Sequence, residues 1–282
     1  MLHRISTSMM ALAAGALIAS PSLATDTADV IFRNGTVITM NDRQPTAEAV
    51  AVKGGWILAV GPEAEVIQAA GDTTETVDLD GKTLLPGFVD SHGHAHMIGL
   101  QALSANLLPP PDGHGKDIPA LQSLLAEWEK VEGNPLRQLG WIVGFGYDDS
   151  QLAEQRHPTR KELDKVSTEL PVLIIHQSGH LGVANSKALE LAGVNAATDD
   201  PDGGVFRREE GSREPNGVME EYAFFQLIGT LAANFHDAIN DTLVNEGVRL
   251  LASFGYTTGQ EGRASGVGIA AMERVAARGE LP

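Results

Sequence analysis

The chain of 282 residues is long enough for one or two domains. Its 20 Lys and Arg against 37 Asp and Glu give a formal net charge of −17, so it lacks the excess of cations with which proteins bind nucleic acid or an anionic membrane surface. It contains no cysteine, which excludes disulfides, thiol nucleophiles and cysteine-ligated zinc or iron–sulfur centres. Histidine and carboxylate remain as ligands for a metal ion.

The first 24 residues have the pattern of a secretory signal peptide. A short segment with Arg4 precedes the apolar run 9–19, and the small residues Ser22 and Ala24 stand at the −3 and −1 positions of a cleavage site. A run of eleven apolar residues is too short for a membrane span, which needs about 20. The pattern therefore predicts cleavage after Ala24 and export to the periplasm, with no membrane span.

Residues 25–83 are predicted to form a small β unit. Asn34-Gly35 separates the apolar runs 30–32 and 36–39, and Lys53-Gly54-Gly55 separates 48–52 from 56–60. Both arrangements predict β-hairpins, because Asn and Gly tolerate the positive φ of a tight turn. A short helix over 62–70 and strands at 76–79 and 83–85 complete the unit.

From residue 84 onwards, strands and helices alternate. Short apolar runs at 84–89, 141–145, 171–175 and 256–258 each lead into polar residues. Helical patterns follow them, and the Gly- and Asp-rich stretch 199–216 is typical of an inserted loop or hairpin. Helices are predicted near 118–131, after Thr159, and at 185–192, 220–233, 238–253 and 267–278. This alternation favours a parallel α/β fold over 84–282, with four of the eight strands of a (β/α)₈ (TIM) barrel.

The sharpest chemical feature is His92-Gly93-His94. Residues i and i+2 of an extended segment point to the same side, so both imidazoles can reach one metal ion. Such a pair also occurs by chance as two surface histidines in a loop, but here it ends an apolar strand. His96 continues the alternation and is interpreted as a neighbour rather than a ligand.

Residues 85–94, LPGFVDSHGH, resemble the opening metal motif of the amidohydrolase superfamily. The β-rich segment ending at 78–82 resembles the β-sandwich half that precedes this motif. Further stretches are similar, in the same order, to the YtcJ-like branch, amidohydrolase family 3. These stretches are 146–149 (GYDD), 157–160 (HPTR), 179–180 (GH), 185–189 (NSKAL), 200–204 (DPDGG) and 215–217 (PNG). The resemblance covers residues 28–282.

The resemblance implies a hydrolase that uses a divalent ion, usually Zn²⁺, to activate water against carbon–nitrogen bonds other than peptide bonds in small amide-like substrates. It implies His92 and His94 as metal ligands and Glu261, after the strand 256–258, as the carboxylate ligand. The alternative for Glu261 is an acidic residue that favours the N-terminus of the next helix. His180, which follows the third strand, is the candidate catalytic residue that contacts the substrate carbonyl or a metal-bound oxygen, and its alternative is a structural histidine beside a helix.

Other titratable residues carry weaker signals. His176 follows the same strand as His180, and Asp148 and Asp149 are candidates for the pocket wall or for a simple turn. His114, His157 and His236 have no supporting context and are predicted to be surface or cap residues.

The sequence departs from the family pattern after Glu261, where the short remaining stretch contains no histidine. The family's two later histidines and its final aspartate, the general base, have no counterpart. We therefore expect an N-terminal half of a family member that needs a C-terminal half or a second copy as partner. A non-catalytic remnant and a small-ligand-binding module are the alternatives.

Overall fold

The computed structural model describes residues 26–281, so the predicted signal peptide lies outside the described residues. The chain forms two compact units that divide between Pro86 and Gly87. Each unit is described by itself below. Across residues 26–281, none of the helices combines the length and the apolar character that a bilayer crossing requires.

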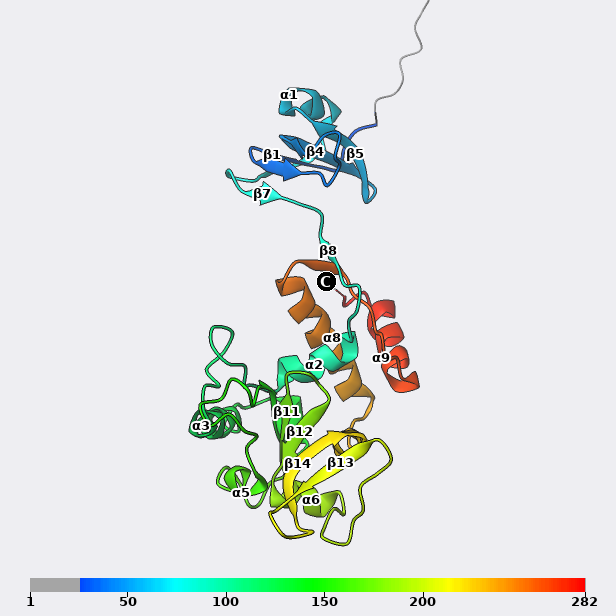
Figure 1. Cartoon of the computed structure of the whole chain (residues 1–282). Helices are drawn as coiled ribbons and strands as arrows, with labels where there is room; N and C mark the ends of the chain where they lie inside the picture. The colour runs from blue at the N-terminus through cyan, green and yellow to red at the C-terminus, as the bar shows by residue number, and fades with distance from the viewer. Residues whose placement is uncertain (1–25, 282) are drawn as a thin grey trace, which may run out of the picture. The chain divides into compact units, whose positions relative to one another are not determined.

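The first unit contains two small sheets (Figure 1). A four-stranded sheet has the order β5-β4-β1-β6, and a three-stranded sheet has the order β3-β2-β7. Its core is formed by small and branched side chains that include Ile31, Ala49 and Val66. The strands are β1 (Val30–Arg33), β2 (Thr36–Ile38), β3 (Thr46–Ala47), β4 (Ala49–Lys53), β5 (Trp56–Gly61), β6 (Glu75–Asp78) and β7 (Thr83–Leu84), and the helical turns are α1 (Glu63–Val66) and η1 (Ile67–Ala69).

One of the two predicted hairpins forms. Strands β4 and β5 pair antiparallel around Gly54 and Gly55, which both have positive φ. The hairpin predicted at Asn34-Gly35 is wrong, because β1 pairs with β4 and β6 while β2 joins the other sheet. Asn34 does have a φ of 59°, but an added Cβ on Gly35 would lie 2.4 Å from the carbonyl oxygen of Lys82. The turn packs against the segment before β7 instead of closing a hairpin.

The second unit is built on a six-stranded mixed sheet of order β13-β14-β12-β11-β10-β9. Strands β9, β10 and β11 are parallel, whereas β12, β14 and β13 continue the sheet antiparallel. A separate parallel pair joins β8 to β15. The bounds are β8 (Phe88–Val89), β9 (Ala105–Asn106), β10 (Ile142–Tyr147), β11 (Val172–His176), β12 (Leu181–Ala184), β13 (Gly204–Arg208), β14 (Pro215–Glu221) and β15 (Tyr256–Thr258).

These strands correct the sequence prediction in three places. The run 84–89 does not form one strand, because Thr83 and Leu84 belong to the first unit and only Phe88–Val89 pairs with β15. Strands β9 and β12 were not predicted, and β12 turns the sheet antiparallel. The inserted stretch does form a hairpin, β13–β14. Residues 26–281 form a mixed α/β structure in which the strands do not close into a barrel.

Helices surround this sheet, and those at 118, 160, 186, 222, 237 and 266 begin within a few residues of the predicted starts. Thr159 and Glu162 make a capping box at the start of α5, the helix predicted after Thr159. The core joins the sheet to these helices through side chains such as Leu121, Ile174 and Phe224. The helices are α2 (Ala95–Leu103), α3 (Ile118–Trp128), α4 (Pro135–Gln138), α5 (Arg160–Leu163), α6 (Ser186–Leu191), α7 (Tyr222–Ala232), α8 (Asp237–Ser253) and α9 (Gly266–Ala277).

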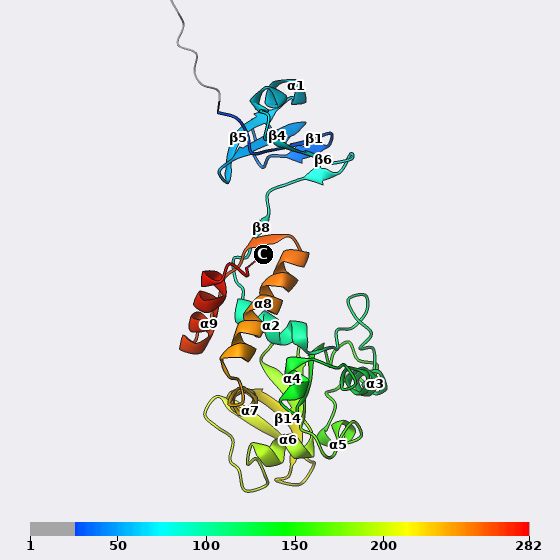
Figure 2. The ribbon, with the colours of Figure 1, turned by 180° about the vertical axis from the view of Figure 1, so that it is seen from behind.

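Two glycines bring α2 and α8 into backbone contact. A Cβ on Gly99 would lie 1.8 Å from the carbonyl oxygen of Leu243, and one on Gly247 would lie 2.2 Å from that of Ala95. Figure 2 shows the two helices crossing, with α9 beside α8. Since no larger residue fits at either contact, the glycines fix how α8 lies against the first turn of α2.

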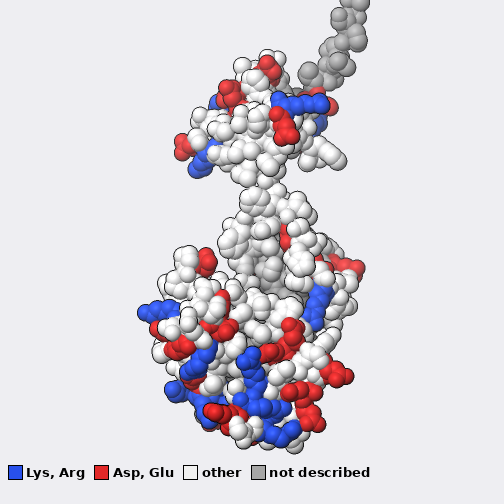
Figure 3. All heavy atoms as spheres, in the orientation of Figure 1, with Lys and Arg blue, Asp and Glu red and all other residues white. Residues whose placement is uncertain are grey.

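Charged side chains of both signs share the surface of the second unit. On the face drawn in Figure 3, basic and acidic groups are interleaved at the end that carries the β13–β14 hairpin. The arginines of this hairpin pair with nearby carboxylates, as in Arg208 with Asp200 and Arg213 with Asp199. The hairpin therefore presents neutralised ion pairs rather than a cationic stripe.

Candidate active site

The histidine motif directly follows β8. The main-chain N–H of His92 donates to Asp90 Oδ1 over 3.2 Å. A Cβ on Gly93 would lie 1.5 Å from Asp90 Oδ2, so Asp90 occupies the space of a side chain at position 93. Asp90 Oδ2 is itself buried and has no hydrogen-bond partner within the described residues. The sequence thus places the two histidines around a glycine that sterics require.

Glu261 meets this motif because β15 pairs with β8. The backbones join through Ala95 N–H to Gln260 O at 3.1 Å and through Gly262 N–H to Gly93 O at 2.7 Å. The Glu261 side chain is 7% exposed; its Oε2 accepts the main-chain N–H of His96 at 2.9 Å, and its Oε1 lies 3.4 Å from His94 Nδ1. Two predicted ligands that are 167 residues apart in the sequence therefore face one another.

The donor set is of the kind that Zn²⁺ accepts, since imidazole nitrogen and carboxylate oxygen are both common zinc ligands. The nearly buried Glu261 carboxylate and the facing nitrogen of His94 fit a shared ion. His92 does not complete the set in this arrangement. Its ring meets that of His94 edge to face, with centroids 5.9 Å apart, and the three residues do not bring their ligand atoms within 4.8 Å of one another.

His96 is a neighbour of the pair, as the sequence suggested. Its Nε2 lies 3.0 Å from Oδ1 of Asn240, which is 2% exposed on α8. The amide of Asn240 donates to the carbonyl oxygen of His236. Helix α8 thereby holds the His96 ring, while the His96 main chain binds Glu261.

His180 lies in the turn between β11 and β12, where its side chain is 59% exposed. Its Nδ1 lies 2.9 Å from Oε2 of Glu221, the residue that precedes α7. Its ring packs edge to face on Phe225, with centroids 5.9 Å apart. Because Glu221 binds Nδ1, Nε2 is the ring nitrogen of His180 that has no hydrogen-bond partner among the described residues.

A cavity of about 430 Å³ connects these groups. Glu261 and His96 contribute to its wall, as do Gly179, which precedes His180, and Phe225. The guanidinium of Arg263 lies over the Phe225 ring, 4.3 Å from its centroid. The cavity therefore brings the carboxylate predicted to bind metal and the surroundings of His180 to one space.

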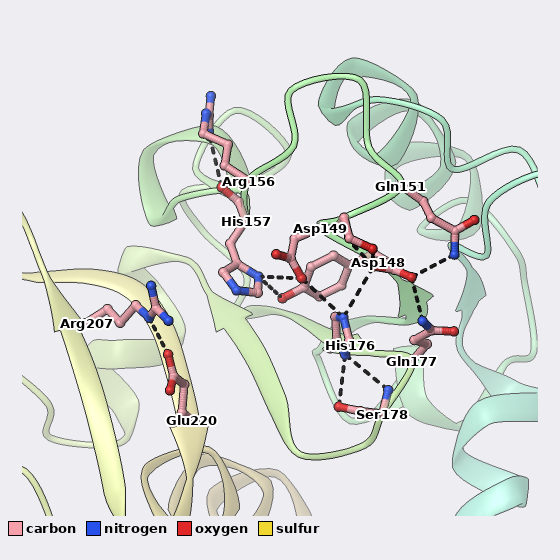
Figure 4. A network of polar contacts seen from close by, with 12 residues as sticks. Asp148, Asp149, Gln151, Arg156, His157, His176, Gln177, Ser178, Arg207 and Glu220 are labelled. Atoms are coloured by element: carbon pink, nitrogen blue, oxygen red, sulfur yellow. Dashed lines mark hydrogen bonds and ion pairs between the residues drawn. The ribbon is translucent and has the colours of Figure 1, made fainter.

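A second group of polar side chains lies at the ends of β10 and β11 (Figure 4). Asp148, Asp149 and His176 are the one set among residues 26–281 that brings three ligand atoms within 4.8 Å of one another. His176 Nε2 lies 3.3 Å from Asp149 Oδ1 and 3.8 Å from Asp148 Oδ1. The sequence had assigned these residues only weak signals.

The Asp148 carboxylate in this group is already occupied. Ser150 donates to Oδ1 through its N–H and its hydroxyl, and the amides of Gln151 and Gln177 donate to Oδ2. Burial raises the pKa of Asp148, but these hydrogen bonds outweigh burial and the pKa stays below its usual value. The Ser178 N–H also donates to His176 Nδ1, which leaves the proton of a neutral ring on Nε2, facing the carboxylates. The group is thus a closed hydrogen-bonded network rather than an open metal site.

His157 belongs to this network, so its prediction as a surface or cap residue is wrong. The Tyr147 hydroxyl lies 3.1 Å from His157 Nδ1, and Asp149 Oδ1 lies 3.7 Å from the same nitrogen. Burial lowers the pKa of His157 below its ordinary value and raises that of Tyr147, so Tyr147 donates to a neutral imidazole. The closeness of Tyr147 and Asp149 in sequence was a signal, but nothing local pointed from them to His157. His114 is exposed, and His236 stands at the N-cap position of α8, where its side chain makes no capping hydrogen bond.

Comparison with known proteins places this site in a family. The amidohydrolase family model matches residues 75–282, so the chain belongs to the amidohydrolase family. The branch indicated by the sequence motifs is confirmed, because the Bacillus subtilis (strain 168) protein YtcJ is 31% identical over 196 residues, covering 68% of this chain and 35% of YtcJ.

Two further similarities extend this result. The N-substituted formamide deformylase of Arthrobacter pascens is 38% identical over 196 residues, covering 69% of this chain and 34% of that protein. A crystal structure of a metal-dependent hydrolase from Pyrococcus horikoshii OT3 is 23% identical with a TM-score of 0.60, covering 89% of this chain and 46% of that chain. The second match shows a shared fold. The chain spans about a third to a half of the length of these relatives.

Proposed function

We propose that the chain forms part of a metal-dependent hydrolase that uses activated water to cleave the carbon–nitrogen bond of small, non-peptide amides. Family membership supports a hydrolase, and the similarity to the N-substituted formamide deformylase of Arthrobacter pascens supports an amide substrate. The observation that carries the proposal is the contact between His94 and Glu261 at the wall of a cavity. The proposed fold of the complete enzyme is the (β/α)₈ barrel, of which β8–β11 and β15 supply the first parallel strands.

We propose His92, His94 and Glu261 as the residues that hold the divalent ion, with Zn²⁺ as the metal. A Zn²⁺ ion supplies the chemistry of a Lewis acid, lowering the pKa of water to about 7 and polarising the carbonyl to be attacked. The chain's own contribution is to hold the ligands. The main-chain N–H groups of His96 and Arg263 both donate to the Glu261 carboxylate, which keeps it oriented toward His94.

His180 is proposed to contact the substrate carbonyl. The Glu221 carboxylate binds Nδ1, which fixes a proton on that nitrogen and leaves Nε2 free to accept or donate toward a substrate. Packing on Phe225 holds the ring next to the cavity wall. Removing Glu221 should therefore weaken the orientation of His180 without removing the imidazole.

The metal proposal is tested by zinc stoichiometry after equilibration with Zn²⁺ and removal of unbound ion. We expect His94→Ala and Glu261→Gln to lose bound zinc, and His92→Ala to lose part of it. His114→Ala is the matched control, because His114 is an exposed histidine of the same unit. Equal stoichiometry in all four variants and the parent would contradict the assignment.

We further propose that the protein is exported to the periplasm and begins at Thr25 after processing. The proposal is supported by the apolar run 9–19 and the small residues before position 25. N-terminal sequencing of protein from the periplasmic fraction should give Thr-Asp-Thr. Retention of Met1 on cell-associated protein would contradict it.

A further inference from the structure

The cavity next to Glu261 has a mostly apolar wall. Six of its lining side chains are Phe145, Phe224, Phe225, Phe235, Ile228 and Leu243, contributed by β10, α7, α8 and the α7–α8 connection. Its volume of about 430 Å³ lies within the range of small-molecule sites, about 300–1,000 Å³. The size and the aromatic lining suit a ligand that buries an apolar group.

Most polar groups on the wall already have partners inside the protein. Glu261 is bound by the His96 and Arg263 main chains, and His96 Nε2 pairs with Asn240. Ser265 accepts the N–H of Gly268 and caps α9. The Arg263 guanidinium is the exception, because it lies on Phe225 and has no hydrogen-bond or ion-pair partner among the described residues. Away from Arg263, a polar or cationic substituent would lose its hydration without compensation.

Arg263 marks the polar end of this space. Its guanidinium stacks on Phe225 at 4.3 Å, and its main chain binds the Glu261 carboxylate. The stacking holds one aromatic wall in place beside the carboxylate. The cavity therefore has a polar end at Glu261 and an apolar body between α7 and α8.

We propose that this cavity selects amides that carry an uncharged aromatic or branched aliphatic substituent, which lies against the phenylalanines while the amide faces Glu261. The inference rests on the proposed hydrolase function for the orientation of the amide. Binding of the apolar substituent follows from the cavity alone. The predicted ligand class is thus an N-substituted or acyl-substituted amide with a hydrophobic arm, and not a positively charged amide.

Gly229 is a position at which the cavity can be narrowed. It lines the cavity from α7, it is exposed, and an added Cβ would meet no atom within 4 Å. Gly229→Leu is therefore expected to narrow the cavity at its exposed side without displacing the backbone, and loss of a helical glycine favours folding. Gln226→Leu is the matched control, since Gln226 is an exposed residue of the same helix that does not line the cavity.

The test measures binding of N-(2-phenylethyl)acetamide and N-ethylacetamide to the full chain by titration calorimetry, with EDTA present so that hydrolysis plays no part. We expect the phenylethyl probe to bind at least tenfold more tightly, with a negative heat-capacity change. Gly229→Leu should weaken that binding at least tenfold, while Gln226→Leu leaves it unchanged. Equal affinities for the two probes, or full binding by a folded Gly229→Leu variant, would overturn the inference.

A second measurement separates this inference from the proposed function. Bound zinc in the full chain is measured beside the affinities for the two probes. Selective binding of the phenylethyl probe by a chain that holds no zinc would refute the proposed metal site and leave the apolar site standing. Stoichiometric zinc with equal affinities for both probes would refute the selectivity and leave the metal site standing.

Discussion

Replacing Gly93 by alanine tests whether the histidine motif depends on its central glycine. The new Cβ would start 1.5 Å from Asp90 Oδ2 and 2.5 Å from its carboxyl carbon, far inside contact distance. The Asp90 side chain must rotate away, which breaks its hydrogen bond to the His92 N–H. Loss of that bond and local overpacking together should lower the free energy of unfolding by about 2 kcal/mol. Bound zinc should fall as well, because His92 and His94 lose their fixed backbone.

The assay for Gly93→Ala is urea denaturation followed by circular dichroism, with zinc content measured on the same samples. Gly229→Ala is the control, because it adds the same methyl group where nothing lies within 4 Å. In the double variant Asp90→Ala/Gly93→Ala the clash is absent, so its destabilisation should be smaller than the sum of the two single changes. A Gly93→Ala protein within about 0.5 kcal/mol of the parent, with full zinc, would refute the reasoning.

Three further outcomes are expected. Asn185→Ala should lower the free energy of unfolding by at least about 3 kcal/mol in urea melts, because the buried Asn185 makes four hydrogen bonds to main-chain groups. Burial lowers the pKa of His157 in the folded state, so the unfolded chain binds a proton first as the pH falls below about 6.5. The free energy of unfolding should therefore decrease on acidification. A His157→Gln variant in which the free energy of unfolding depends on pH with the same slope as in the parent would contradict this. The chain should self-associate through its exposed apolar strand β8, where Phe88 is 49% and Val89 67% exposed. Sedimentation velocity should show this association, and Val89→Lys should reduce it. A parent chain that stays monomeric at all concentrations would contradict the prediction.

Local signals in the sequence predicted the local structure well. The Lys53-Gly54-Gly55 turn closes its hairpin and Thr159 with Glu162 caps α5, since both depend on residues within a few positions of each other. The Asn34-Gly35 turn failed because the strands beside it find partners elsewhere in the chain. Strand β9 escaped prediction because it has only two residues.

The site was predictable to the extent that the family motif encodes it. His94 and Glu261 were named from sequence and do lie together, but the orientation of His92 depends on side-chain packing that no motif specifies. His157 was missed because no sequence motif assigns it a role. Its role arises from Tyr147 and Asp149, which the fold brings within hydrogen-bond and ion-pair distance of the His157 ring.

The pairing of His94 with Glu261 also has a consequence for how the chain folds. The contact closes a loop of 167 residues that includes most of the second unit, and long loops form late because their closure is entropically unfavourable. An ion bound by both residues would crosslink the two ends of that loop. Such a long-range crosslink restricts the conformations of the unfolded chain. Release of the ion would then loosen α2, α8 and β15 together rather than one turn at a time. The time for which the ion stays bound to His94 and Glu261 would then set how long the second unit stays folded.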